Sequence, residues 1–404
     1  MLDQDIMNDL EVFTKTIMKN EGIAEYDINI EGQTEKGTNY SSEIVFFSVT
    51  PKTVEKKYSF VMKTTKRSKK MRELSQDAVG DKREMHLYSK VAPAIRQMLI
   101  ESASDFHLEN MTQPYLVNED PGHETMIMDN LKAKGFRLWD TNKPMNMEHI
   151  RTVLSNYGKY HASTMALRFK NPKVFANLTK EMNNIFAAFI DDEGVRKLFG
   201  DYMRDAIQIL NKAGLKNIAE KLEEVPENVI NILANCPNEE DKVLITHGDC
   251  WINNMMFKYK NAESLEPLGV CFLDFQLSSF GSPATDLSYF LYTSCDENTI
   301  TNEFENLLQF YYDSFSSTLK KLALDPEEIF SILKLKDHWR KYAISGLIMA
   351  AFVIKVQLAK KDEAAPDISE SGDLSLMKLG QIENNDHFES RIIAVFKNFA
   401  KTCM

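Results

Sequence analysis

The chain has 404 residues, of which 43% are hydrophobic and 26% charged, values that are ordinary for a folded globular protein and too large for one small core. Its formal net charge of −11 argues against a protein that binds nucleic acid or an anionic membrane through its overall field, although a local basic pocket stays compatible with it. Five cysteines without a C-x-x-C pair predict a reducing compartment, and we expect a cytoplasmic protein.

The N-terminal segment MLDQDIMNDLEVF is acidic and lacks the pattern of a signal peptide. The longest apolar run, GLIMAAFVI at 346–354, is about half the length of a membrane span. We therefore expect a buried helix there and no membrane insertion.

The N-terminal part of the chain is rich in strand patterns. Apolar residues at helical spacing predict a helix over 7–20, and a strand, a polar turn and a second strand are expected within 27–50. Another strand is predicted over 56–66, a helix over 81–95 and a short strand over 123–131.

Helical patterns dominate from about residue 145 onward, beginning with a long helix over 147–168. A strand over 242–249 runs into a loop, and strands over 255–259 and 268–275 form a hairpin. Helices follow again from Asp286. This order predicts an α+β protein with a small β-rich N-terminal lobe, a large mostly helical C-terminal lobe and a ligand cleft between them.

These predicted elements and the loops between them carry polar residues of the types that phosphoryl transfer requires. Lys63 lies on the strand face opposite Tyr58, Phe60 and Met62, whereas Asp249 and Asn254 lie in the loop THGDCWINNMMF. Phosphoryl transfer needs a lysine for the nucleotide phosphates, oxygen ligands for Mg²⁺ and a carboxylate that accepts the proton of the attacking hydroxyl.

The spacing of the loop residues matches that of protein kinases. Those enzymes use H-R-D, four residues and then Asn, with the D-F-G aspartate further on. Here His247-Gly248-Asp249 precedes Asn254 by four intervening residues, and Asp274-Phe275 follows at the end of the predicted hairpin. This pattern predicts an ATP- and Mg²⁺-dependent phosphotransferase.

The segments THGDCWINNMMF, VCFLDFQLSSFGSPATDLSYFL and GTNYSS, with HA at 161–162, resemble the ecdysteroid kinase-like family. This family is an insect-rich branch of the choline kinase and aminoglycoside phosphotransferase group, and the resemblance extends over about residues 10–400. It implies a bilobal protein-kinase-like fold, with a nucleotide-binding lobe at 1–130 and a catalytic and acceptor-binding lobe at 131–404. It also implies phosphorylation of a small-molecule hydroxyl, which in the best-known members belongs to an ecdysone-type steroid.

The resemblance implies roles for individual residues. Asp249 would be the general base, Asn254 and Asp274 the Mg²⁺ ligands, and Lys63 the contact to the α- and β-phosphates with Glu84 as its helix partner. Further implied positions are Gly37, Asn39 and Ser41 as the cover of the phosphates, Asp129, Asn130 and Leu131 as backbone contacts of the adenine, and His247 and Asp286 as supports of the catalytic loop.

The chain also departs from related patterns. The phosphate loop is not G-x-G-x-x-G, so cover by backbone N–H groups is less well defined. The connector reads MIMDNL where relatives usually carry Glu-Asp-Leu, and Gln276 replaces the glycine of D-F-G, as it does in this branch.

Structural alternatives exist for several of these residues. Taken alone, Lys63 fits a solvated strand position and Glu84 an exposed helix position; only their context favours the phosphate role. His161 is expected to pack and form hydrogen bonds between helices, and Trp251 to anchor the loop. Asn253 has no assigned role.

Three functions remain open at this stage. One is a kinase for an ecdysteroid or similar lipophilic alcohol, a second is a detoxification kinase for plant or foreign alcohols and phenols, and a third is a catalytically silent binding protein with the same fold. The presence of all the central polar residues argues against the third. In each case the partner is a small molecule.

Overall fold

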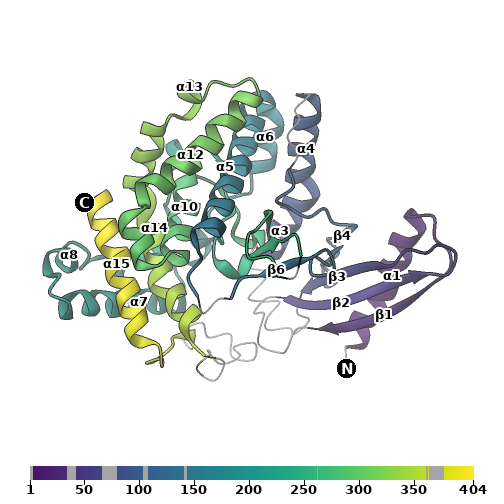
Figure 1. The fold of residues 1–404 in the computed structure, drawn as a ribbon, viewed down its shortest axis with the longest axis horizontal. Helices are drawn as coiled ribbons and strands as arrows, with labels where there is room; N and C mark the ends of the chain where they lie inside the picture. Colours follow the sequence, from purple (N-terminus) through teal and green to yellow (C-terminus); the bar gives the residue numbers. More distant parts are fainter. Residues whose placement is uncertain are drawn as a thin grey trace.

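The computed structural model describes residues 3–33, 42–65, 80–102, 108–140, 143–261, 263–360, 363 and 377–404. They form an α+β, bilobal kinase-like fold, with an antiparallel sheet in the N-terminal lobe and a larger helical C-terminal lobe (Figure 1). The predicted fold class is confirmed.

The N-terminal lobe consists of a sheet and a helix packed on one of its faces. The sheet has the order β1-β2-β3-β5-β4, with strands β1 (Tyr26–Gln33), β2 (Ser42–Pro51), β3 (Tyr58–Thr65), β4 (Leu116–Asn118) and β5 (Thr125–Asp129). Helix α1 (Gln4–Asn20) begins where the side chain of Asp3 accepts a hydrogen bond from the N–H of Asp5. Its apolar stripe forms one hydrophobic core with the inward side chains of β2 and β3.

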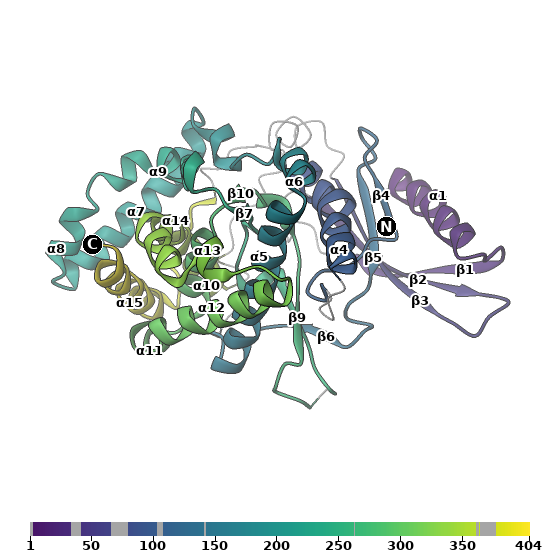
Figure 2. The same ribbon diagram turned by 90° about the horizontal axis from the view of Figure 1, so that it is seen from above.

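Helices α3 (Gly80–His86) and α4 (Ala92–Glu101), joined by the π-helical turn η1 (Leu87–Val91), lie between the sheet and the C-terminal lobe (Figures 1 and 2). Their buried side chains belong to the large core of the C-terminal lobe rather than to the core under α1. Strand β5 joins both cores because side chains alternate along a strand: Ile127 enters the small core, and Met126 and Met128 enter the large one.

The C-terminal lobe is built around long helices. Asn146 and Ser331 cap α5 (Met147–Lys170) and α14 (Ile332–Leu358). The other helices of eight or more residues are α6 (Pro172–Thr179), α7 (Glu193–Lys212), α9 (Val225–Ala234), α10 (Pro283–Ser294), α12 (Phe304–Lys321) and α15 (Asn385–Cys403), and the shorter ones are α8 (Lys216–Lys221), α11 (Glu297–Asn302) and α13 (Pro326–Phe330).

Helix α14 contains the apolar run 346–354, which is buried as expected. Among the described residues one helical stretch, Pro326–Leu358, is long and apolar enough to cross a membrane by length and composition alone, and 78% of its apolar window is buried inside the protein. Gly346 allows this helix to approach α10 closely, because a Cβ there would lie 2.4 Å from the backbone of Ser288.

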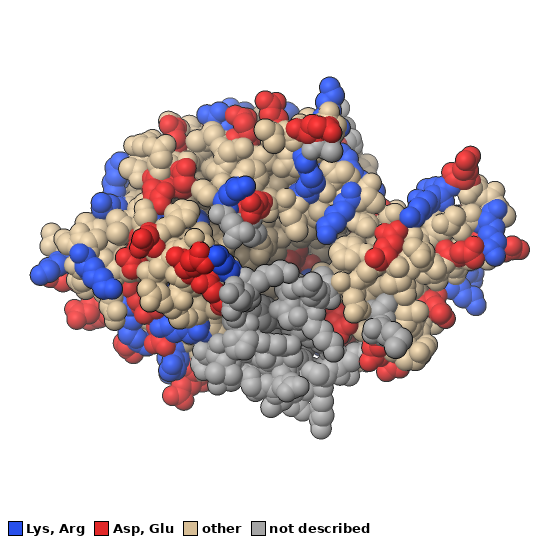
Figure 3. All heavy atoms as spheres, turned by 60° about the horizontal axis from the view of Figure 1, so that its bottom comes forward, with Lys and Arg blue, Asp and Glu red and all other residues tan. Residues whose placement is uncertain are grey.

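Short strands flank the H-G-D loop, residues 246–254. The predicted hairpin is present as β8 (Met255–Lys258) and β9 (Gly269–Phe272), and β6 (Phe136–Leu138) adds a third strand. The expected strand over 242–249 is reduced to β7 (Leu244–Ile245), which pairs with β10 (Phe280–Gly281). Figure 3 shows the described surface hollowed where the two lobes meet, with acidic and basic side chains interspersed over both.

Candidate active site

Lys63 is held between two carboxylates that come from distant parts of the chain. Its Nζ lies 2.6 Å from Oε2 of Glu84 on α3 and 2.9 Å from Oδ1 of Asp274 after β9. The Lys63 and Glu84 side chains are only 11% and 2% exposed. Lys63 is therefore not a solvated strand residue, and Glu84 is not an exposed helix residue. Burial opposes the charged form of Lys63, but the two carboxylates outweigh it and raise the pKa of the ammonium group.

Asp286 organises the backbone of the catalytic loop from the first turn of α10. Its buried carboxylate accepts hydrogen bonds from the N–H groups of His247 (2.7 Å) and Gly248 (2.9 Å) and from Nε2–H of His161 (3.0 Å). Burial alone would raise the pKa of Asp286, but these donors hold it below its ordinary value. This contact is the support predicted for Asp286, and it places His161 in the same network, packed and hydrogen-bonded between helices as expected.

Gly248 adopts a conformation that a side chain would not tolerate. Its φ is +87°, and a Cβ would lie 2.2 Å from the carbonyl oxygen of Leu277. The glycine therefore lets the loop pass close beneath the segment that follows Asp274.

His247 connects the loop to the end of β9. Its Nε2 donates to the carbonyl of Leu273 (2.9 Å), and its Nδ1 accepts from the N–H of Asp249 (3.2 Å). Burial lowers the pKa of the imidazole, against the opposing charge of Asp286, so the ring is the neutral Nε2–H tautomer. His247 thus spans the two segments that carry Asp249 and Asp274.

Both oxygens of the Asp249 carboxylate accept hydrogen bonds. Oδ1 accepts from the hydroxyl of Tyr289 on α10 (2.9 Å) and Oδ2 from Nδ2 of Asn254 (2.7 Å). Burial, and then the charge of Asp274, raise the pKa of Asp249 to about 7, while these hydrogen bonds oppose the rise. A carboxyl with a pKa near neutrality is suited to exchange a proton with a hydroxyl.

Asn254 and Asp274 fit the oxygen-donor set of a Mg²⁺ site. Because Nδ2 of Asn254 is turned toward Asp249, its Oδ1 is left without a donor among the described residues. Asp274 adopts the left-handed conformation (φ 60°), and its side chain is 28% exposed. Among the described residues no group of three or more His, Cys, Asp or Glu side chains could hold a metal ion by itself, so a Mg²⁺ here would need the nucleotide phosphates as further ligands.

The predicted adenine strip runs along the end of β5. The N–H of Asn130 donates to the carbonyl of Ser59, and Phe60 lies opposite Asp129 in the non-hydrogen-bonded register, so the Asp129 carbonyl points away from β3. The N–H of Leu131 has no acceptor among the described residues. The Asp129 carbonyl and the Leu131 N–H are therefore available for hydrogen bonds to an adenine edge. The Asn130 N–H is used within the sheet.

An apolar floor lies next to this strip. Leu131 packs with Met256 of β8 and Cys271 of β9 in a small hydrophobic cluster, together with Phe136 and Leu273. The side chain of Asp129 faces elsewhere, since it binds Lys134 and the hydroxyl of Tyr115. A flat heterocycle placed against the strip would meet backbone polar groups at its edge and apolar side chains on its face.

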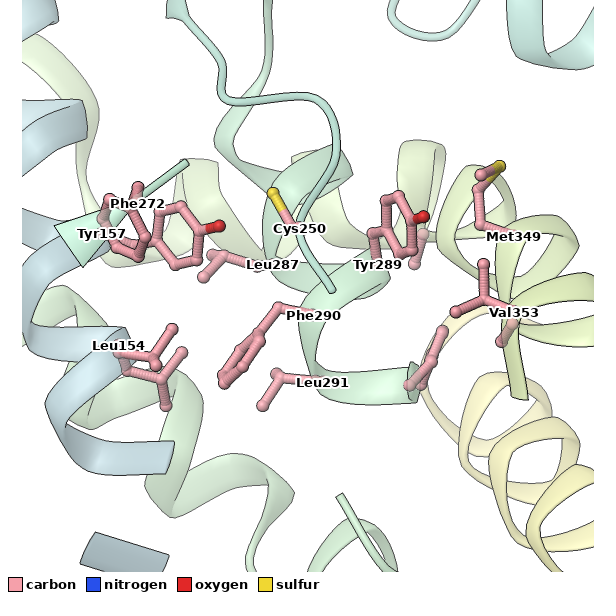
Figure 4. Close-up of a cluster of buried hydrophobic side chains, with 14 of the residues drawn as sticks. Leu154, Tyr157, Cys250, Phe272, Leu287, Tyr289, Phe290, Leu291, Met349 and Val353 are labelled. Atoms are coloured by element: carbon pink, nitrogen blue, oxygen red, sulfur yellow. The ribbon is translucent and has the colours of Figure 1, made fainter. Parts of the chain in front are cut away.

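A cavity of about 50 Å³ lies behind the catalytic loop. Its lining includes Gly248, Tyr289 and several apolar residues of the helical lobe, namely Ile185, Phe186, Leu233, Leu277 and Met349. Figure 4 shows α10 between two groups of side chains, with Tyr157 and Phe272 on one side and Tyr289 and Met349 on the other. Tyr289 therefore stands between Asp249 and an apolar wall.

Sequence reasoning did not single out two residues that the fold brings to the site. Tyr289 follows the predicted Asp286 by one helical turn, and this i, i+3 spacing was the available signal. Arg83 precedes Glu84 and donates from Nη1 to the carbonyl of Ser278 (3.0 Å), which ties α3 to the D-F-Q segment. No pattern in the sequence indicates the hydrogen bond between Arg83 and the Ser278 carbonyl.

The remaining predicted positions have different outcomes. Gly37, Asn39 and Ser41 lie outside the described residues. Trp251 is half-buried and packs against the large core, as expected of a loop anchor. The side chain of Asn253 is exposed, so it takes no part in the contacts of Asp249.

Comparison with known proteins agrees with this geometry. No curated protein matches the chain. The sequence model of the ecdysteroid kinase-like family matches residues 36–324, a span that begins before β2, contains every described site residue and ends after α12. The chain belongs to the ecdysteroid kinase-like family, a family of kinase-like phosphotransferases.

Proposed function

We propose that this protein transfers the γ-phosphoryl group of ATP to a hydroxyl group of an ecdysteroid or a similar lipophilic alcohol. The observation that carries the proposal is the position of the Lys63 ammonium between Glu84 and Asp274, with the charge of Asp274 acting in turn on Asp249. A structural ion pair needs only one of these carboxylates, whereas a nucleotide site needs a lysine beside a metal-binding aspartate.

The chain's residues divide the reaction between them. Lys63 would hold the α- and β-phosphates, and Asp249 would accept the proton of the acceptor hydroxyl as its oxygen attacks the γ-phosphorus and the bond to the β-phosphate oxygen breaks. Asn254 Oδ1 and Asp274 would hold Mg²⁺, which when bound neutralises charge on the phosphates. Asp286 and His247 keep the base in place through the loop backbone.

The helical lobe supports a lipophilic acceptor. The wall behind Tyr289 is largely apolar, and the described lining of that cavity contains Asp286 as its one acidic side chain, fully engaged with the loop. A cationic acceptor would need a free acidic group as well, and the described lining offers none. The cavity of about 50 Å³ has room for only a few water molecules, so a steroid would require the surrounding helices to move apart.

The four buried cysteines and the half-buried Cys403 are all free, which supports the proposal of a reducing, cytoplasmic location.

Labelled ATP and a panel of acceptors test the proposed function. Purified protein with Mg²⁺ is incubated with ecdysone, a plant phenol and choline, and label transfer is followed by chromatography. We expect transfer to ecdysone above the other two; preferred transfer to the phenol would favour the detoxification role instead.

Asp249→Asn is the matched control for chemistry. It keeps the size of the side chain but removes the base, so we expect turnover to fall by about 10²- to 10⁴-fold while ATP still raises the melting temperature. Near-normal turnover would contradict Asp249 as the base. Failure of ATP with Mg²⁺ to stabilise even the unsubstituted protein would point to a silent binding protein.

A further inference from the structure

A second hollow lies outside the candidate active site, between α3 with η1, the turn joining β4 to β5, and the end of α6. Its volume is about 600 Å³, which is within the range of small-molecule pockets, about 300–1,000 Å³. Its described lining includes none of Lys63, Glu84, Asp249 and Asp274. It is therefore a separate feature that the proposed phosphotransfer does not use.

The wall formed by α3 contains a buried cation without an ionic partner. Arg83 is only 5% exposed, yet no carboxylate among the described residues pairs with its guanidinium. Nη1 donates to the Ser278 carbonyl and Nε is enclosed without an acceptor, so Nη2 is the nitrogen left to face the hollow. A buried charge is costly unless an opposite charge compensates it, which suggests that the compensating group is a ligand.

Further basic side chains line the hollow. Lys82 and Lys90 are exposed along α3 and η1, and Nε2–H of His86 donates to the Leu178 carbonyl (2.9 Å) at the rim toward α6. Lys180 adds a fourth basic group from the end of α6. Positive charge thus gathers around Arg83 in a chain whose net charge is −11.

Acidic side chains also line the hollow and limit the ligand. Glu119 and Glu124 line it from the β4–β5 turn, and Glu181 from beyond α6. Oε2 of Glu124 is already engaged by the Thr65 hydroxyl (3.1 Å) and the Gly122 N–H (2.9 Å). A ligand that is negatively charged at all its ends would be repelled by these carboxylates, whereas neutral hydroxyl groups could donate to them.

We propose that this hollow binds a phosphate group, free or as the monoester of a small hydroxylated molecule, with the phosphate on Arg83 and Lys82. A planar guanidinium can donate two parallel hydrogen bonds to two phosphate oxygens. The flexible ammonium group of the neighbouring lysine adds positive charge without requiring a fixed geometry. Since Arg83 also holds the Ser278 carbonyl and adjoins Glu84, a ligand there stabilises the arrangement of α3 against the D-F-Q segment.

Calorimetric titration with inorganic phosphate and with glycerol phosphate tests the site. The whole protein is saturated with Mg²⁺ and a non-hydrolysable ATP analogue, so that the nucleotide site does not contribute. We expect both probes to bind, and Arg83→Gln to weaken them at least tenfold. Tighter binding of glycerol phosphate would identify an ester as the ligand, and equal binding would identify free phosphate.

Arg168→Gln is the matched control. Arg168 also donates from Nη1 to a backbone carbonyl, that of Lys242 (2.9 Å), and has no carboxylate partner among the described residues, but it does not line the hollow. Its substitution should leave both affinities unchanged. Equal affinities of the two variants, or no binding of either probe to the unsubstituted protein, would overturn the proposal.

A second variant covers the case in which Arg83→Gln does not fold. Lys82 and Lys90 are exposed, so replacing both with Gln leaves the packing of α3 intact. We expect at least threefold weaker binding of phosphate and a shallower dependence on salt. Unchanged affinity in this double variant would also refute the site.

Discussion

Asp286→Asn separates the support of the H-G-D loop from the chemistry that we propose for it. In the protein, Oδ2 accepts from both His247 N–H and His161 Nε2–H, whereas Oδ1 accepts from Gly248 N–H. An asparagine has one acceptor oxygen. It keeps the most bonds when that oxygen takes the place of Oδ2, and its NH₂ group then faces the Gly248 N–H.

The cost follows from these contacts. An orphaned buried N–H costs about 1–3 kcal/mol, and each of the two surviving bonds loses about 1 kcal/mol when its acceptor becomes neutral. We therefore expect Asp286→Asn to lower the free energy of unfolding by about 3–5 kcal/mol. Because the displaced segment carries Asp249, turnover should fall at least about 100-fold even where the variant is fully folded.

Urea unfolding followed by circular dichroism measures the first effect, and steady-state phosphorylation below the unfolding midpoint measures the second. Asp241→Asn is the control, since Asp241 also accepts from several groups, including Lys341 and Tyr342, but is 18% exposed, and these partners lie on α14 rather than in the loop. It should cost less than about 1.5 kcal/mol and leave turnover unchanged. An Asp286→Asn variant within about 1 kcal/mol of the unsubstituted protein would refute the reasoning.

Three further substitutions or conditions test other parts of the site and fold. Tyr289→Phe removes one hydrogen bond from Asp249, so kcat should fall about tenfold with KM for ATP unchanged; Tyr292→Phe on the same helix should change neither. Gly248→Ala should abolish turnover and lower the urea midpoint, because its Cβ meets the Leu277 carbonyl. Burial lowers the pKa of both His149 and His338 to about 4. The unfolded chain therefore binds more protons below pH 6.5, and stability that is complete above pH 6.5 should decline by about 1–2 kcal/mol per histidine at pH 5. Urea midpoints at pH 7 and pH 5 that do not differ would contradict this.

The local order of elements could be predicted because each long element carries its own periodicity. Helices α1 and α5 and the hairpin β8–β9 lie where apolar spacing placed them. The strands β4 and β6 were not predicted, since three residues are too few for an alternating pattern to be recognised. The strand expected over 242–249 is reduced to two residues, which pair with the equally short β10.

The sequence by itself determined the chemical inventory: a strand lysine, an H-G-D loop with an asparagine five residues after the aspartate, and a D-F motif after a hairpin. These signals are local, because the spacing within one loop or hairpin survives in the linear chain. Tertiary structure alone decided which groups meet. Lys63 and Asp274 are 211 residues apart, and Tyr289 is 40 residues from Asp249. Periodicity shows which face of an element is polar or apolar, but the partner across that face depends on how helices and sheets pack. This packing brought Tyr289 to Asp249 and left Arg83 without a carboxylate partner among the described residues.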